Sequence, residues 1–188
     1  MIPYQKEKIE NAICFFAKEH YKKTHHHIYQ TFLYKYLALF DFGYFKKYGK
    51  QPLGLKYMAM EKGPVPIEIY SKRIDEQWSK LFIFKPDDND KFIIISKDSP
   101  NLDYFSRREI KLMNELIEIY AQSYITAKLM SDVSHESIAA WRKTWQKEKN
   151  AFIDFSLELS SNVFEKPENE LTFPEEVYIT QKGLENCI

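Results

Sequence analysis

Glycine, cysteine and long apolar runs are all scarce in this sequence of 188 residues. Its five glycines are not clustered, which excludes a glycine-rich loop that could cradle phosphates. The two cysteines, Cys14 and Cys187, lie near opposite ends, so neither a disulfide framework nor a paired metal site is indicated. No apolar run approaches the roughly 18–20 residues that span a bilayer, and the charged start lacks the apolar core of a signal peptide. We therefore expect a cytoplasmic protein that does not contact a membrane.

The sequence also lacks an excess of either charge. Its 27 Lys and Arg residues balance 27 Asp and Glu residues, which gives a net charge of zero. Proteins that bind nucleic acid usually carry a clustered basic excess that neutralises phosphates. The longest basic cluster, Lys46, Lys47 and Lys50, is short and is interpreted as a solvated helix end. The balance argues against a nucleic-acid partner, although a local basic patch stays open as an alternative.

Aromatic residues, in contrast, are abundant. Fourteen Phe, thirteen Tyr and three Trp make up 16% of the chain. Each large ring can bury roughly 150–250 Å², so these residues can stabilise a core that contains few aliphatic side chains. Tyr and Trp are also favoured at the centres of protein interfaces. The composition therefore suits a globular domain that binds another protein.

Apolar residues recur at helical spacing in several segments. The strongest pattern covers 28–48 and is followed by Gly49, which can close a helix at positive φ. Ser106 and Glu109 form a capping-box pattern that begins a helix reaching about Tyr120. We expect the apolar residues of these two helices to be largely buried: Phe32, Leu33, Tyr36, Leu37, Phe40, Met113, Leu116 and Ile117. Other helices are expected over 4–21, 66–76, 126–133 and 138–145.

Shorter apolar runs predict a small sheet. The runs 81–84 and 92–96 flank an Asp- and Asn-rich turn, which is typical of a β-hairpin. The alternation of apolar and polar residues over 153–159 predicts one more strand. The expected fold is a single α+β domain, predominantly α-helical, with a small antiparallel β-sheet or hairpin.

The segment Gly63-Pro64-Val65-Pro66 follows a further expected strand, 53–60. Two prolines remove backbone donors, and Gly63 permits a sharp bend. We expect a strand-to-helix junction here, with Gly63 in a backbone conformation that disfavours residues with a Cβ. The junction would lead into the short helix 66–76.

Few residues suggest chemistry. His25, His26 and His27 are consecutive, and adjacent residues on a helix point in different directions, so we interpret them as structural or surface residues and expect no metal site. His135 beside Glu136 could act as a general base, but the nearby serines 131, 134 and 137 lie in no recognised nucleophile motif. We expect His135 and Trp141 to fix a turn between helices. The sequence therefore predicts no catalytic residues, no cofactor and no enzyme activity.

Five segments, in order, are similar to motifs of the Panacea (SocA-like) antitoxin family. Phe32–Phe42 resembles the helix that opens these domains, 49–60 resembles their glycine- and tyrosine-containing strand segment, and Gly63–Pro66 matches their GPVP signature. Phe105–Glu109 resembles a family helix start, and Ser134-His135-Glu136 with Trp141 resembles a His and Trp element. Trp141 stands farther from His135 than is usual in the family. The resemblance covers 32–145, so we expect a Panacea-like domain over 1–150 and a C-terminal extension over 151–188, packed on the domain or trailing from it.

This resemblance implies an antitoxin of a two-gene toxin–antitoxin system. Such a domain neutralises its cognate toxin, usually encoded nearby, by direct protein–protein contact, and is associated with bacterial, phage and mobile-element genomes. A SocA-like resemblance also allows a role as an adaptor that presents the bound partner to a protease. The oligomeric state and the identity of the toxin do not follow from the sequence.

We place the expected toxin-contact surface on the 53–60 strand and the GPVP segment. Methionine is unbranched and adaptable, which suits surfaces that accommodate varied partners, and the prolines reduce the entropy lost on binding. The predicted partner-binding residues are Tyr57, Met58, Met60, Gly63, Pro64 and Val65. The alternative is that these residues only pack the small sheet against the helices.

A second function class stays open. Helices followed by a small sheet can form a winged helix, and 177–184 resembles the last strand of such modules. The alternative function is therefore a DNA-binding transcriptional regulator, which would require a continuous basic face.

Overall fold

The computed structural model describes residues 2–75, 77–87 and 91–185 of the chain. It is a predominantly helical α+β fold with two small antiparallel sheets, as the sequence predicts. In chain order, its elements are α1 (Gln5–Thr24), β1 (Ile28–Tyr29), α2 (Gln30–Tyr48), β2 (Tyr57–Met60), β3 (Gly63–Pro66), α3 (Ile67–Lys72), β4 (Phe82–Asp87), β5 (Lys91–Ser96), η1 (Leu102–Tyr104), α4 (Arg107–Tyr120), α5 (Ala127–Ser137), α6 (Ala139–Lys147), η2 (Phe155–Glu158), η3 (Glu168–Glu170) and α7 (Phe173–Glu185).

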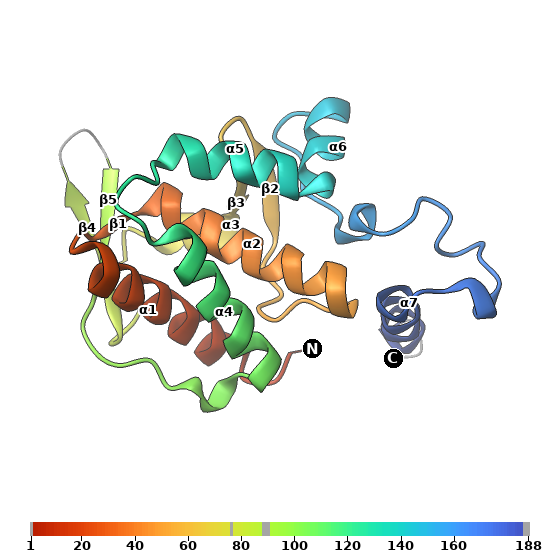
Figure 1. The fold of residues 1–188 in the computed structure, drawn as a ribbon, viewed down its shortest axis with the longest axis horizontal. Coiled ribbons are helices and arrows are strands. Elements are labelled where there is room, and N and C mark those ends of the chain that lie inside the picture. Colours follow the sequence, from red (N-terminus) through yellow and green to blue (C-terminus); the bar gives the residue numbers. More distant parts are fainter. Residues whose placement is uncertain (1, 76, 88–90, 186–188) are drawn as a thin grey trace.

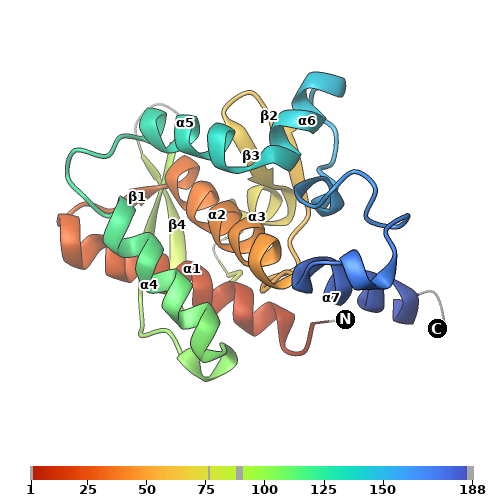
Figure 2. The same ribbon diagram turned by 45° about the vertical axis from the view of Figure 1, so that its right-hand side comes forward.

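Helix α2 forms the centre of the molecule. It contacts α1, α4, α5, β3 and α7, so most of the other helices surround it (Figures 1 and 2). Such a helix must be apolar on all sides rather than on one stripe, and thirteen of its residues are buried. Within the described ranges, none of the helices combines the length and the apolar character needed to cross a membrane.

The predicted core residues of α2 and α4 are confirmed. All eight are buried, and the most exposed of them retain only 6% of their accessible surface. Their rings and methyl groups join one hydrophobic cluster that extends through the domain. In this cluster the rings of Phe16 and Tyr36 stack at 4.8 Å between α1 and α2. Aromatic side chains therefore supply much of the core.

Local signals define the ends of these helices. Gly49 closes α2 at a φ of 70°, and its N–H donates to the Phe45 carbonyl. Ser106 and Glu109 form the predicted capping box at the start of α4. Glu109 also accepts a hydrogen bond from the buried ammonium of Lys8 at 2.6 Å, which links α4 to α1.

The histidine run ends helix α1. His25 adopts a left-handed φ of 59°, and its N–H donates to the Tyr21 carbonyl at 2.8 Å. The ring of His27 then stacks on Tyr21 with 4.5 Å between centroids. These contacts give the run a structural role at the turn after the helix.

The predicted hairpin is present as β4 and β5, and β1 adds a third strand. The expected helix 28–48 therefore starts too early: Ile28 and Tyr29 are extended and pair with Ile94 and Ile93. Ile28 is only 1% exposed, so burial in this sheet outweighs its place in the helical pattern. Residues 88–90 of the predicted turn lie outside the described residues.

The GPVP segment is a strand, so the predicted strand-to-helix junction is wrong at this point. Gly63–Pro66 pairs with Tyr57–Met60 in a second hairpin, and the helix that follows, α3, begins at Ile67. Pro64 and Pro66 lie opposite Ala59 and Tyr57 in this hairpin. The backbone groups of Ala59 and Tyr57 point away from β3 and form hydrogen bonds with residues 150–153 instead. At such positions a proline removes no hydrogen bond from the ladder.

Two predictions for the C-terminal part are wrong. Residues 153–159 were expected as a strand, but Phe155–Glu158 form a short 3-10 turn, because the Asp154 side chain accepts from the Ser156 N–H and Phe155 stacks on Phe42 at 3.9 Å. Residues 177–184, expected to resemble the last strand of a winged helix, belong to helix α7. Both η2 and α7 contact α2, so the described part of the extension packs on the domain.

Candidate functional site

Most of the predicted partner-binding residues lie inside the domain. Tyr57 is completely buried and Val65 is 8% exposed, while Gly63 and Pro64 are also buried. The expectation that these four residues form an accessible surface is therefore wrong for this structure. The physical reason is that β3 contacts both α2 and α5, which cover it. Of the six predicted residues, only the methionines 58 and 60, on β2, are partly exposed.

Tyr57 instead completes a buried polar network. Its hydroxyl donates to Asp41 Oδ2 at 3.1 Å, and the N–H of Leu53 donates to Asp41 Oδ1 at 2.8 Å. Burial raises the pKa of Asp41 to about 7, although both hydrogen bonds act in the opposite direction. The network fixes β2 and the loop before it to helix α2, and it explains why Tyr57 points inward.

A third extended segment completes the outer face of the hairpin. The N–H of Ala59 donates to the Ala151 carbonyl, and the N–H of Ile153 donates to the Tyr57 carbonyl, both at 2.9 Å. This pairing places Phe152 opposite Met58, with 60% of Phe152 exposed. Phe152 is not among the residues predicted from the sequence, where its only signal is its position just before an alternating segment.

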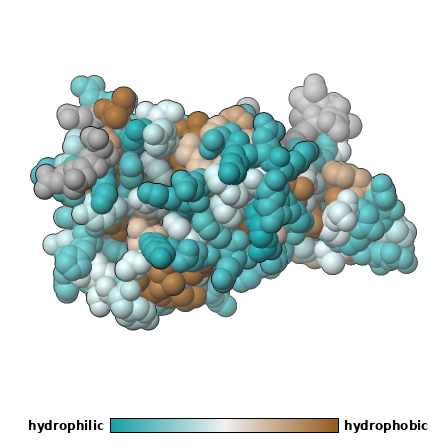
Figure 3. All heavy atoms as spheres, turned by 90° about the horizontal axis from the view of Figure 1, so that it is seen from above, coloured by the Kyte–Doolittle hydropathy of each residue, from teal (hydrophilic) through white to brown (hydrophobic). Residues whose placement is uncertain are grey.

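We refer to Met58, Met60 and Phe152 as the hairpin face. These three side chains are apolar, at least partly accessible and carried by paired segments rather than by a free loop. On the side of the molecule drawn in Figure 3, hydrophobic residues form separate patches on a mainly hydrophilic surface. The hairpin face is therefore a candidate surface for contact with another protein.

His135 and Trp141 connect α5 and α6 to this hairpin. The two rings stack with 3.8 Å between centroids and an interplanar angle of 3°. The indole is 5% exposed, and its N–H donates to the Met60 carbonyl at 3.1 Å. The pKa of His135 is lowered, first by burial and then by the charge of Lys35, whereas a hydrogen bond with the Lys62 backbone acts to raise it.

A buried lysine lies beneath the hairpin. Lys35, on α2, is 1% exposed, and its Nζ has no hydrogen-bond partner among the described residues. Burial lowers the pKa of this amine from 10.5 to about 7. Lys35 is not among the residues predicted from the sequence. Its sequence signal is that the residues three and four positions away on the helix are all uncharged: Thr31, Phe32, Ala38 and Leu39.

Gly63 brings the polar groups of two helices together. The Lys35 amine, the Ser134 hydroxyl and Nε2 of His135 all lie within 3.3 Å of the position that a Cβ of Gly63 would take. Gly63 has a φ of +103°, which confirms the predicted unusual conformation. We refer to Lys35, Ser134 and His135, which come from α2 and α5 and meet at β3, as the amine cluster.

Replacing Gly63 by Val is expected to lower the free energy of unfolding by about 1–3 kcal/mol. A Cβ would be strained at this φ and would also collide with the amine cluster. Gly183→Val is the matched control, because nothing lies within 4 Å of a Cβ at Gly183 in helix α7. Urea unfolding of both variants tests the expectation, and equal stability of the Gly63 variant and the wild type would contradict it.

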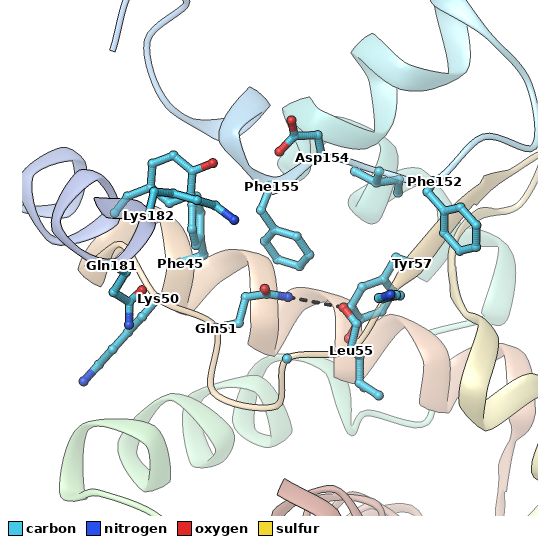
Figure 4. Close-up of a pocket in the computed structure, with 14 residues that line it drawn as sticks. Phe45, Lys50, Gln51, Leu55, Tyr57, Phe152, Asp154, Phe155, Gln181 and Lys182 are labelled. Atoms are coloured by element: carbon cyan, nitrogen blue, oxygen red, sulfur yellow. Dashed lines mark hydrogen bonds between the residues drawn. The ribbon is translucent and has the colours of Figure 1, made fainter. Parts of the chain in front are cut away.

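A cleft lies between the domain and the C-terminal segment. It has a volume of about 520 Å³ and is bounded by the loop before β2, the segment 152–155 and helix α7 (Figure 4). Gln51 and Leu55, which line it, are joined by a 3.2 Å hydrogen bond from the Gln51 amide to the Leu55 carbonyl. The lining also combines aromatic rings with lysines 50, 56 and 182. Residues beyond 150 therefore contribute to the surface of the domain.

The fold and the hairpin define a small helical α+β domain with an apolar β-hairpin on its surface. The family model described as antitoxin SocA-like, Panacea domain, matches residues 33–142, more than half of the chain. The chain therefore belongs to the SocA-like Panacea antitoxin family, which confirms the resemblance found in the sequence. The match extends from α2 to α6 and includes the whole amine cluster. No curated protein and no solved structure matches the chain.

Proposed function

We propose that this protein is the antitoxin of a toxin–antitoxin pair and that it neutralises a cognate toxin by direct contact. The family match over residues 33–142 carries this proposal. The toxin would be encoded beside the antitoxin gene, and both would act in the cytoplasm. We propose binding rather than catalysis as its activity, and a role as a protease adaptor is a compatible extension.

The hairpin face is the contact surface that we propose. Met58 and Met60 can adjust their shape to a partner, and Phe152 adds a large rigid ring beside them. The paired segments hold all three in place, so little conformational entropy is lost on binding. Pro64 and Pro66 leave the outer edge of β3 without donors at two positions, which discourages a partner from adding a strand there. Contact through side chains is therefore favoured over strand addition.

The DNA-binding alternative has less support. Its motivating feature was a C-terminal strand, and 177–184 are helical instead. The net charge is zero, and several exposed basic side chains are paired with acidic ones on the same helix, as Lys72 is with Glu68. Such pairs reduce the positive potential that a nucleic-acid surface requires.

Replacing Met58 and Met60 together by Asp is expected to weaken toxin binding by about 30-fold or more, because truncating or charging the centre of an interface typically costs at least about 2 kcal/mol. The product of the neighbouring reading frame is co-expressed with each variant, and growth rescue and the Kd are measured. The matched control replaces Ile74 and Ile119, which are 71% and 57% exposed on other parts of the surface, by Asp.

This experiment distinguishes failure of the proposed contact surface from failure of the proposed antitoxin function. A folded Met58 and Met60 double variant that still restores growth would place the interface elsewhere. A neighbouring product that is not toxic, or that does not bind the wild-type protein, would contradict the antitoxin function itself.

A further inference from the structure

The amine cluster is poorly satisfied as it stands. Lys35 Nζ and His135 Nε2 are both buried, and neither has a hydrogen-bond partner among the described residues, although the Lys62 backbone lies close enough to the imidazole to raise its pKa. The hydroxyl of Ser134 donates to the Ser131 carbonyl at 2.7 Å, so its lone pairs remain available to the cluster. Burying a polar group without a partner is costly, and burying an unpaired cation is more so. Two such groups aimed at one point indicate a place where something else binds.

Lys35 supplies the charge inside the cluster, whereas the charges around it are of both signs. Burial alone lowers the pKa of Lys35, so no carboxylate of the described chain compensates its charge. On α5, Asp132 acts to raise the pKa of His135, but Lys35 acts more strongly to lower it. At the turn between β2 and β3, Glu61 and Lys62 are exposed and carry opposite charges. An anion that reached the cluster would therefore meet an ammonium whose desolvation is already complete.

We propose that Lys35 and His135 of the amine cluster form a binding site for a single carboxylate group, reached when the turn between β2 and β3 lifts. One oxygen would accept from the Lys35 ammonium. The other would accept from the imidazole, which takes up a proton at Nε2 as the carboxylate arrives. This site lies behind the hairpin face and does not depend on the antitoxin function.

The chemistry favours a carboxylate over a larger or more highly charged anion. A single ammonium and one imidazole offer two donor directions, which match the two oxygens of a carboxylate. A phosphate would bring more charge and more oxygens than these two donors can satisfy. Gly63 packs directly against the cluster, so the space that an opened turn leaves is small.

The entry route is built into the hairpin. His135 is only partly buried, and the turn residues beside it are exposed. Gly63 can change its backbone angles more readily than any residue with a Cβ, so it serves as a hinge for the turn. Movement of this one turn would expose the Lys35 amine without disturbing α2 or α5.

Sodium acetate is the probe for the free protein, with sodium chloride at the same ionic strength as its control. Binding is followed by NMR of the Lys35 side chain and the His135 ring. Because the pKa of the Lys35 amine is about 7, its protonated fraction falls about 30-fold between about pH 6 and pH 8.5. The affinity for acetate should fall by at least this factor, because the imidazole must also take up a proton. Calorimetry in buffers of different ionisation enthalpy should record proton uptake at neutral pH.

Three variants make the test specific. Lys35→Met removes the ammonium, and His135→Phe removes Nε2 while keeping a ring to stack on Trp141. Both are expected to lower the affinity for acetate by about tenfold or more, because each removes a charge-assisted hydrogen bond. Lys111→Met, at a side chain that is 79% exposed, should bind acetate as the wild type does. Acetate that shifts neither the Lys35 nor the His135 resonances of the wild type overturns the proposal, even if a variant fails to fold. Equal affinity of the wild type and folded Lys35→Met overturns it as well.

A second arm identifies the source of the carboxylate. If it is an Asp or Glu side chain of a partner protein, Lys35→Met should weaken the complex with the neighbouring-gene product as well as acetate binding. If it is a free organic acid, only acetate binding should change. Because the acetate arm uses no toxin, failure of the site and failure of the antitoxin function give different results.

Discussion

Lys35→Met is expected to raise the free energy of unfolding by about 3–5 kcal/mol below pH 7. Methionine has nearly the shape of the lysine stem and needs no hydrogen bond, whereas the amine of Lys35 is buried without a partner among the described residues. A pKa lowered from 10.5 to about 7 corresponds to a destabilisation of this size, at about 1.4 kcal/mol for each factor of ten.

The stability difference between Lys35→Met and the wild type depends on pH. Between pH 7 and pH 10.5 the unfolded chain keeps the Lys35 proton and the folded chain releases it, so the stability of the wild type rises with pH. The destabilisation is complete below pH 7 and disappears as the pH approaches 10.5. The gap between Lys35→Met and the wild type should therefore shrink by about 2–3 kcal/mol between about pH 6.5 and pH 9.

Urea unfolding of both proteins at several pH values measures this gap. Other groups titrate in the same range, among them Asp41, but they are common to both proteins and largely cancel in the difference. Lys111→Met serves as the control, because its side chain is exposed and its removal should leave the pH profile unchanged. A gap that is constant with pH would contradict the assignment of Lys35 as a buried, titrating amine.

A gain in stability together with a loss of binding would fit a functional residue. Side chains that lower the stability of a fold and are nevertheless present commonly serve binding or catalysis. Lys35→Met tests the two properties together, because the same substitution is expected to stabilise the domain and to weaken acetate binding.

Leu37→Ala is expected to lower the free energy of unfolding by about 2–5 kcal/mol. Leu37 is completely buried near the middle of α2, the helix around which the others pack. The loss combines the transfer energy of the removed methyl groups with the cavity that remains, and surrounding aromatic rings cannot collapse freely into that space.

Thermal and urea unfolding should both record this loss, with an unchanged m-value in urea. Leu184→Ala is the matched control, because the Leu184 side chain is 63% exposed and its truncation should cost less than about 0.5 kcal/mol. Similar stability of the two variants would mean that α2 is not the centre of the core.

Sequence patterns determined the features that depend on neighbouring residues. The apolar pattern of α2, its end at Gly49, and the Ser106 and Glu109 capping box all follow from residues within a few positions of one another. The unusual φ of Gly63 was also predicted locally, from the absence of a Cβ beside two prolines. The family motifs between 32 and 145 belong to this group, because they consist of short ordered segments.

Tertiary structure decided the features that join distant segments. Ile28 lies in a strand rather than in the predicted helix because it pairs with Ile94. Phe152 belongs to the hairpin face because it lies opposite Met58, although the two residues are far apart in the chain. Likewise, the amine cluster forms only where Lys35 on α2 meets residues of α5. Periodicity can show that a side chain is buried, but it cannot show which groups share that interior. Long-range packing chooses those groups, because the free energy of burial depends on every segment that meets in the core.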